Sequence, residues 1–235
     1  MALPKLNDTP SYTVTVPSTG QQTTFRPFLV KEQKALMIAY ETQDRKDMLR
    51  SVVNTIEACI EEPIKGTLAT FDVDYLFTKI RAKSVGESAD INAKCSECET
   101  ENEVKVDIDK VEVVGEVVDS VIALNDKISI KMKYPSYEDF LSNDTLLDSK
   151  SEMESMLQLS IACIDSVLTE DERISMKDES KEEVMGFIDS MSSEQFEKIT
   201  NFISSVPSVT QTIEFECTSC SHKNERTLKG MDDFF

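Results

Sequence analysis

The amino-acid sequence predicts an α+β fold, and three observations carry this prediction. Runs that alternate between apolar and polar residues occur near the start, in the middle and at the end of the 235-residue chain. Two long stretches between these runs place apolar residues three and four positions apart, as an amphipathic helix does. A cysteine motif also occurs twice, each time between strand-like residues. A chain of this length can bury a core in one or two compact units.

These patterns divide the chain into five consecutive segments, each described by its dominant pattern. They are an N-terminal β-hairpin at 1–30, a helical block at 31–86, a β-rich segment with the first cysteine turn at 87–134, a second helical block at 135–207, and a C-terminal strand pair with the second cysteine turn and a tail at 208–235. We expect the strands around the two cysteine turns to meet in space although they are distant in the sequence.

The N-terminal hairpin follows from local residue types. Tyr12 to Val16 alternates in polarity, Pro17 to Gly20 favours a turn, and Thr23 to Leu29 is rich in β-favouring residues. Alternation or β-favouring residues predict the remaining strands at 89–94, 103–108, 111–118, 127–133, 210–216 and 224–228.

Helices are predicted from apolar spacing and from residues that cap helix ends. Val30 to Thr42 and Asp47 to Ile60 carry apolar residues at helical offsets, and Asp72 is a plausible N-cap for a helix that runs to about Ser84. In the second block, an apolar stripe from Met153 to Val167 predicts a further helix. Two capping boxes, at 180–183 and 192–195, predict the starts of two more.

The charge of the chain bears on the class of partner. With 25 Lys+Arg against 44 Asp+Glu, the formal net charge is −19, and such a field repels a phosphate backbone. We therefore expect no nucleic-acid partner. No apolar run reaches the ~20 residues that span a bilayer, and the first residues lack the apolar stretch of a signal peptide. We expect a cytosolic protein without a membrane partner.

Catalysis is not predicted. The chain has one histidine, His222, and no Trp, so a histidine-dependent triad would have to use His222. None of the six glycines stands in a phosphate-binding loop, and no carboxylate pair stands out. The prediction is a protein that is not an enzyme and has no small-molecule substrate.

The repeated cysteine motif carries the most specific chemistry. Cys95-Ser-Glu-Cys98 and Cys217-Thr-Ser-Cys220 are each followed by three residues and then Asn-Glu, so both read C-x-x-C-x-x-x-N-E. A turn between two strands that presents two thiolates is the form of a zinc knuckle, and two knuckles supply the four soft ligands of tetrahedral Zn²⁺. A closed four-cysteine site leaves no open position, so the predicted role of the zinc is structural.

Two alternatives to bound zinc stay open for these cysteines. The two pairs could be ancestral knuckles without bound metal, or they could carry redox or disulfide chemistry, although a redox C-x-x-C normally opens a helix and a cytosolic location disfavours disulfides. Cys59 and Cys163 lie on apolar helical stripes and are predicted to be buried structural thiols. His222 is predicted to be a solvated turn residue, with a role as substitute ligand as the alternative.

The last residues are a candidate partner-binding segment. Met231, Phe234 and Phe235 follow the final predicted strand and are separated by two aspartates. Either they fold back onto the protein's own core or they anchor in a pocket of a partner, since aromatic anchors dominate many interfaces.

Several longer motifs resemble a known family. These are the stretches at 25–34 (Phe-Arg-Pro-Phe-Leu-Val-Lys-Glu-Gln-Lys), 70–77 (Thr-Phe-Asp-Val-Asp-Tyr-Leu-Phe), 81–86 (Arg-Ala-Lys-Ser-Val-Gly), 190–198 and 228–235. Together they resemble the base plate hub proteins of T4-type contractile-tailed phages, including the hub assembly factors. The resemblance spans nearly the whole chain and implies a non-enzymatic protein whose partners are other baseplate hub or tail proteins.

The resemblance and the cysteine motifs together give the expected function. We expect a hub protein or hub assembly factor that acts through protein–protein contacts, with a structural Zn²⁺ site, in the cytoplasm of the infected host or in the tail baseplate of the virion. The alternatives are a zinc-ribbon regulator that binds polymerase or nucleic acid, for which only Lys223, Arg226 and Lys229 offer basic residues beside a knuckle, and a thiol oxidoreductase.

Overall fold

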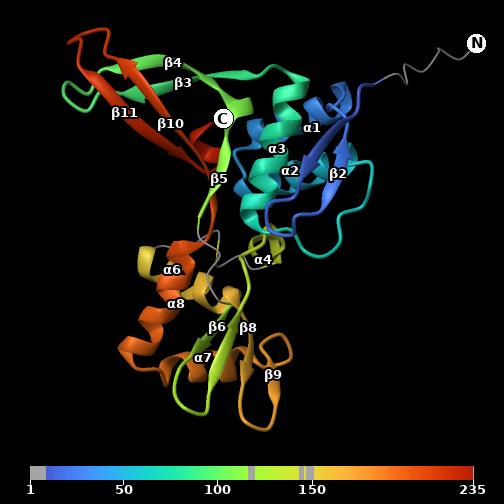
Figure 1. Cartoon of the computed structure of the whole chain (residues 1–235), viewed down its shortest axis with the longest axis vertical. Helices are drawn as coiled ribbons and strands as arrows, with labels where there is room; N and C mark the ends of the chain where they lie inside the picture. Colours follow the sequence, from blue (N-terminus) through green and yellow to red (C-terminus); the bar gives the residue numbers. More distant parts are fainter. Residues whose placement is uncertain (1–8, 116–119, 143–145, 147–150, 235) are drawn as a thin grey trace, which may run out of the picture. The chain divides into compact units, whose positions relative to one another are not determined.

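The structure is a computed structural model that describes residues 9–115, 120–142, 146 and 151–234. The fold is α+β, as predicted, and the chain divides into two compact units (Figure 1). The split unit comprises Met1–Val114 and Ser208–Phe235, and the inserted unit comprises Gly115–Pro207. In the sequence, the inserted unit therefore interrupts the split unit, whose two parts come before and after it.

The split unit begins with the predicted hairpin. Strand β1 (Tyr12–Thr15) pairs with β2 (Gln22–Phe25) in antiparallel register, and both strands are shorter than the predicted ranges. Because side chains alternate along a strand, Val14 and Phe25 point into the core. Gly20 in the connecting turn has a φ of 68°, a backbone conformation that favours glycine.

Three helices follow: α1 (Val30–Thr42), α2 (Arg45–Cys59) and α3 (Thr70–Ser84). The predicted N-cap of α3 is wrong, because Ala69 occupies that position and Asp72 lies in the first turn of the helix. Its carboxylate accepts the backbone N–H of Ala69 at 2.9 Å and that of Ser18 at 2.8 Å. A carboxylate two or three residues into a helix can reach back to the free amides, so the sequence pattern does not separate the two positions.

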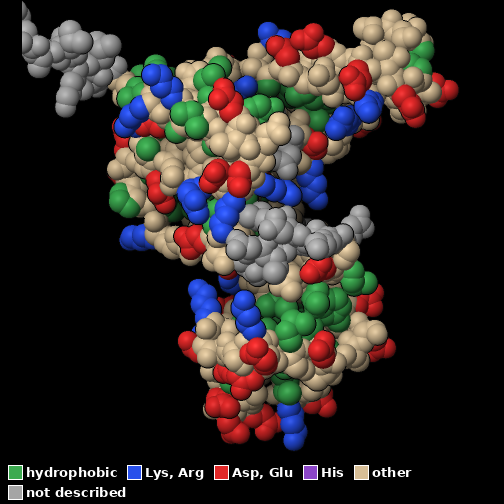
Figure 2. All heavy atoms as spheres, turned by 180° about the vertical axis from the view of Figure 1, so that it is seen from behind, with side chains coloured by type: hydrophobic (Ala, Val, Ile, Leu, Met, Phe, Trp, Pro, Cys, Tyr) green, Lys and Arg blue, Asp and Glu red, His purple; other side chains and the backbone are tan. Residues whose placement is uncertain are grey.

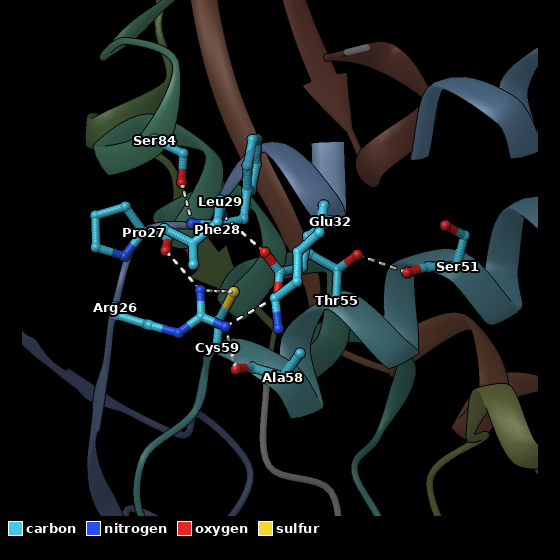
Figure 3. A network of polar contacts seen from close by, with 11 residues as sticks. Arg26, Pro27, Phe28, Leu29, Glu32, Ser51, Thr55, Ala58, Cys59 and Ser84 are labelled. Carbon is cyan, nitrogen blue, oxygen red and sulfur yellow. Dashed lines mark hydrogen bonds and ion pairs between the residues drawn. The ribbon is translucent and has the colours of Figure 1, made fainter. Parts of the chain in front are cut away.

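A polar network around Arg26 joins the hairpin to the first two helices (Figure 3). The guanidinium of Arg26 donates to Oε1 of Glu32 at 2.9 Å and to the carbonyl of Ala58 at 2.8 Å. The second carboxylate oxygen of Glu32 accepts the amide of Leu29 at 2.8 Å, which closes the start of α1. Arg26, Leu29 and Glu32 lie within the motif at 25–34 and Ala58 lies near the end of α2, so this stretch ties the hairpin to two helices.

The chemistry of this network is that of a buried ion pair. Burial raises the pKa of Glu32, but hydrogen bonds from Arg26, Leu29 and Lys31 outweigh it and lower the pKa to about 2. Cys59, beside the guanidinium, is 0% exposed, and burial raises the pKa of its thiol to about 11. Cys59 is therefore a buried core thiol, as predicted.

Two long hairpins complete the split unit. Strand β3 (Ser88–Lys94) pairs with β4 (Glu101–Asp107), and β10 (Ser208–Glu216) lies between β11 (Lys223–Lys229) and β5 (Glu112–Val114). Short 3₁₀ turns follow β4 (Ile108–Lys110) and β11 (Met231–Asp233). One core cluster lies beneath these strands and includes Ala82, Ala89, Val106, Ile108, Val111, Val209, Ile213, Leu228 and Phe234.

The inserted unit has a separate sheet and core. Its strands run in the order β6 (Val121–Ala123), β7 (Ser129–Met132), β8 (Ile164–Leu168) and β9 (Arg173–Ser175), all antiparallel. Its described helices are α4 (Tyr137–Ser142), α6 (Glu152–Cys163), α7 (Lys181–Asp189) and α8 (Ser193–Ser205). Both predicted capping boxes start helices, with Ser180 at α7 and Ser192 at α8.

One secondary-structure prediction fails in this unit. The apolar stripe predicts a helix as far as Val167, but α6 ends at Cys163 and Ile164 already belongs to β8. A short apolar run fits a buried strand as well as a helix, and the pairing of β8 between β7 and β9 decides the outcome here. The region 135–207 therefore mixes helices with strands.

The chain enters and leaves the inserted unit at adjacent positions. Val114 at the end of β5 pairs with Ser208 at the start of β10. Next to this pair, a Cβ atom on Gly115 would lie 2.5 Å from Cα of Pro207, so only glycine fits there. Strand pairing therefore fixes both ends of the insertion.

Candidate metal centre

Both cysteine pairs lie in hairpin turns of the same construction. Cys95 and Cys98 connect β3 to β4, and Cys217 and Cys220 connect β10 to β11. In each turn the amide of the first cysteine donates to the carbonyl five residues later, at 2.9 Å in the first turn and 2.8 Å in the second. The sequence repeat is therefore also a structural repeat, and we call these two turns the knuckles.

The residue after the second cysteine closes each knuckle. Glu99 has a φ of 58° and Ser221 a φ of 57°, and their amides donate back to the carbonyls of the first cysteines at 3.0 and 2.9 Å. This left-handed conformation costs a non-glycine residue roughly 1–2 kcal/mol. The same unfavourable conformation occurs at the equivalent position of both knuckles, which indicates that closing the turn requires it.

The knuckles bring their four sulfur atoms together. All four Sγ atoms lie within 4.8 Å of one another. Sγ of Cys95 lies 3.7 Å from that of Cys220, and Sγ of Cys98 lies 3.5 Å from that of Cys217. A tetrahedral ion with ~2.3 Å bonds to sulfur requires sulfur–sulfur distances of about 3.8 Å. The prediction that the two knuckles meet in space is confirmed, and the spacing fits a single metal ion.

Each knuckle contributes one buried and one exposed thiol. Cys95 and Cys217 are each 2% exposed, whereas Cys98 and Cys220 are exposed. Four cysteine ligands would complete a tetrahedral shell and leave no position for a substrate. This donor set suits a structural ion that is soft enough to prefer sulfur.

Electrostatics also favour a cation at this place. Backbone N–H groups of Cys98 and Glu97, together with the Asn224 side chain, outweigh burial and lower the pKa of Cys95 to about 6. A backbone hydrogen bond at His222 lowers the pKa of Cys220, but the neighbouring cysteine side chains and burial raise it to about 12. Cys220 therefore stays protonated at neutral pH unless a cation offsets the negative charge beside it, and binding a cation to its sulfur releases that proton.

Two asparagines also belong to the centre, although no role was predicted for them from the sequence. Asn102 and Asn224 occupy the asparagine position of the repeated motif, and both are buried. Each reaches across to the opposite knuckle, where Asn102 contacts Thr218 and Asn224 contacts Ser96. Their recurrence in C-x-x-C-x-x-x-N-E was the signal that could have identified them.

The remaining predicted residues lie outside the cluster. The side chain of His222 is exposed and does not belong to the cluster that the four cysteine sulfurs form. Cys163 is 0% exposed in the core of the inserted unit, and burial raises the pKa of its thiol to about 12. Cys163 is therefore a buried core thiol, as predicted.

The three candidate residues of the C-terminal tail have different positions. Phe234 is 1% exposed and belongs to the core cluster of the split unit, so at this residue the tail folds back onto its own protein. Met231 is half-buried and lines a groove beside α1. Phe235 lies outside the described residues.

This groove, which we call the α1 groove, is lined mostly by apolar side chains. Its volume is about 510 Å³, and its lining comprises Phe28, Gln33, Leu36, Met37, Ala39, Tyr40, Glu41, Met48, Val52, Phe77, Arg81 and Met231. Along α1, Met37 is 57% exposed, Ile38 63% and Tyr40 70%. Figure 2 shows hydrophobic side chains at the surface of this unit among Lys and Arg side chains. Exposed apolar surface of this kind marks interaction sites.

The fold and the cysteine cluster define the class of the molecule, an α+β protein with a split four-cysteine centre. None of the helices in the described ranges is long and apolar enough to cross a membrane. The family model described as T4 bacteriophage base plate protein matches residues 9–235, and the chain belongs to this family. The protein is thus a phage baseplate protein, and membership of this family implies interaction with other phage baseplate or tail proteins. Neither a search of curated proteins nor a search of solved structures returned a match.

Proposed function

We propose that this protein is a non-enzymatic component or assembly factor of the baseplate hub and that it carries one structural Zn²⁺ on Cys95, Cys98, Cys217 and Cys220. The observation that carries the metal proposal is the convergence of four sulfur atoms within 4.8 Å, contributed by knuckles more than a hundred residues apart. A zinc ion at this place links the hairpin of β10 and β11 to the hairpin of β3 and β4. Its binding free energy then contributes directly to folding of the split unit.

A role through contacts is supported by the surfaces of the split unit. The α1 groove and the exposed apolar residues of α1 offer area for a partner, whereas no nucleophile–base constellation accompanies the single, exposed histidine among the described residues. Of the three tail residues, Met231 borders the groove, and we assign it and Phe235 to the partner surface. Phe234 contributes to stability.

The rival function of a nucleic-acid-binding regulator has little support. Lys223 and Lys229 lie on one face of β11 with Glu225 between them, and Arg226 lies on the other face. Arg226 also lies 3.5 Å from Asp233. The three basic residues beside the second knuckle therefore do not form one stripe.

A thiol oxidoreductase is the second rival. Both C-x-x-C pairs lie in hairpin turns and not at a helix N-terminus, where the helix dipole would activate a thiol. Titration of native protein with a thiol reagent, with and without chelator, separates the two functions. A zinc protein protects its four knuckle thiols until the chelator is added, whereas an oxidoreductase reacts at once under both conditions.

The hub role is tested in infected cells. Phage with a stop codon in this gene should fail to complete baseplate hubs, and mass spectrometry of purified virions against infected-cell lysate should show whether the protein stays in the baseplate or acts only during assembly. Normal numbers of complete hubs without the protein would refute the hub role. That result would not bear on the zinc site, which metal analysis of the purified protein tests separately.

A further inference from the structure

The two knuckles exchange asparagine side chains in a reciprocal way. Oδ1 of Asn102, from the first repeat, accepts the amide of Thr218 at 2.9 Å and its hydroxyl at 3.0 Å. Oδ1 of Asn224, from the second repeat, accepts the amide and the hydroxyl of Ser96, both at 2.9 Å. Thr218 and Ser96 each follow the first cysteine of their knuckle, so the two contacts are equivalent.

The amide nitrogens of the same side chains face the sulfur cluster. Nδ2 of Asn224 donates to Sγ of Cys95 at 3.5 Å and to the carbonyl of His222 at 3.0 Å. Nδ2 of Asn102 lies 3.8 Å from Sγ of Cys217 and donates to the carbonyl of Thr100 at 2.8 Å. Each asparagine thus fixes its own knuckle, holds the opposite one, and donates to the buried cysteine of the opposite knuckle.

The orientation of these side chains follows from their partners. A backbone N–H can only donate, so the oxygen of each asparagine must face Thr218 or Ser96, and the NH₂ group must face the sulfur and a carbonyl. Both side chains are nearly inaccessible, Asn102 at 3% and Asn224 at 7%. A buried amide with every polar atom engaged is held in one position.

We propose that Asn102 and Asn224 are positioning residues of the metal centre, so that the binding unit is the whole C-x-x-C-x-x-x-N motif and not the four cysteines alone. This inference rests on the proposed zinc site. Through the oxygen, each asparagine sets the distance between the knuckles; through the nitrogen, it disperses charge on a thiolate that the metal shares. Partners that orient metal ligands in this way typically affect metal affinity by about 10–100-fold.

Substitutions at Asn102 and Asn224 separate the two contributions. Asn102→Ala removes the contact of the oxygen with Thr218 and the contact of the nitrogen with Cys217. Asn102→Asp keeps an acceptor for Thr218 but replaces the N–H donor with a negative oxygen beside Cys217. Asn224→Ala and Asn224→Asp make the same changes beside Cys95. The matched controls are Glu103→Gln and Glu225→Gln, because these exposed residues directly follow the two asparagines in the sequence.

The measurement is a titration of the metal-free full chain with Co²⁺ and then with Zn²⁺ against a competing chelator. We expect the alanine variants to lose about 10–100-fold in affinity, the aspartate variants to lose at least as much, and both controls to bind like the unaltered protein. The thiolate-to-Co²⁺ charge-transfer band should move to lower energy in the asparagine variants, because a thiolate without its N–H donor is the stronger electron donor. Far-UV circular dichroism of the bound forms should not change.

The outcomes distinguish this inference from the zinc proposal. If the asparagine variants bind both metals with unaltered affinity and an unaltered band, the positioning role is wrong and the zinc site stands. If affinity falls only together with the helical signal, the asparagines are structural and the positioning role is again wrong. If the unaltered chain binds neither metal, the zinc site itself fails and this inference falls with it.

Discussion

Replacing Glu32 with Gln should destabilise the split unit at neutral pH, and the loss should shrink in acid. Glu32 is 6% exposed and forms an ion pair with Arg26 at 2.9 Å, so its removal leaves a half-buried guanidinium without its counter-charge. Hydrogen bonds lower the pKa of this carboxyl from 4.5 to about 2. At about 1.4 kcal/mol for each pKa unit, ionisation of Glu32 contributes roughly 3 kcal/mol of folding free energy.

The sign of the pH dependence follows from the direction of the pKa shift. A carboxyl whose pKa is lower in the folded state stabilises the protein above its unfolded pKa, and this stabilisation is lost as the pH falls through the folded pKa. The difference between the unaltered protein and Glu32→Gln should therefore be largest at pH 6–7 and should decline from about pH 4.5 toward pH 2. Acid also removes metal from thiolates, but this effect is common to both proteins and cancels in the difference.

Urea unfolding followed by circular dichroism is the suitable assay, because the chain has no Trp. The matched control is Lys31→Gln, which removes the exposed partner of the same carboxylate, 3.2 Å from it and with 71% of its side chain exposed. An exposed ion pair contributes about 1 kcal/mol or less. If Glu32→Gln costs no more than Lys31→Gln, or if its cost is the same at pH 3 as at pH 7, the account of this network is wrong.

Three further substitutions test other parts of the structure. Phe234→Ala should lower the free energy of unfolding by about 3–5 kcal/mol, because the ring is fully buried; an unchanged melting temperature with defective hub assembly would instead make the tail a docking segment. Gly115→Ala should destabilise by about 1–3 kcal/mol, since its Cβ would clash with Pro207, and a neutral effect would contradict the close approach. Ser221→Gly should stabilise the zinc-bound protein by about 0.5–1 kcal/mol in urea unfolding, because glycine tolerates the φ of 57°; a loss of stability would show that this turn is not strained.

The elements whose signals are local were predictable from the sequence. The first hairpin has an alternating run before a Pro-to-Gly turn and β-favouring residues after it, and helices α7 and α8 start at the serines of their capping boxes. The cysteine cluster was predictable for a different reason, because a repeated motif with fixed spacing indicates shared ligand chemistry regardless of what lies between its copies. The cysteine residues could therefore be assigned without a structure.

The features that depend on tertiary contacts were not predictable. The apolar residues of β8 fit the end of a helix as well as a strand, and only pairing with β7 and β9 selects the strand. The meeting of the two knuckles and the recurrence of Asn102 and Asn224 were visible in the sequence, but the contacts that each asparagine makes across to the opposite knuckle depend on the folded geometry. The burial of Phe234 likewise depends on core residues from distant segments.

Elemental analysis of the purified full chain measures whether the four cysteines of the two knuckles hold one zinc ion. We expect one zinc per chain, loss of that zinc in Cys95→Ser and in Cys217→Ser, and retention in Cys163→Ala, which alters a buried thiol of the inserted unit. Chelation should lower the melting temperature of the unaltered protein and leave Cys95→Ser unaffected. A chain that contains no zinc after purification, takes up none on addition, and has the same melting temperature with and without chelator would show that the four cysteines do not form a zinc site.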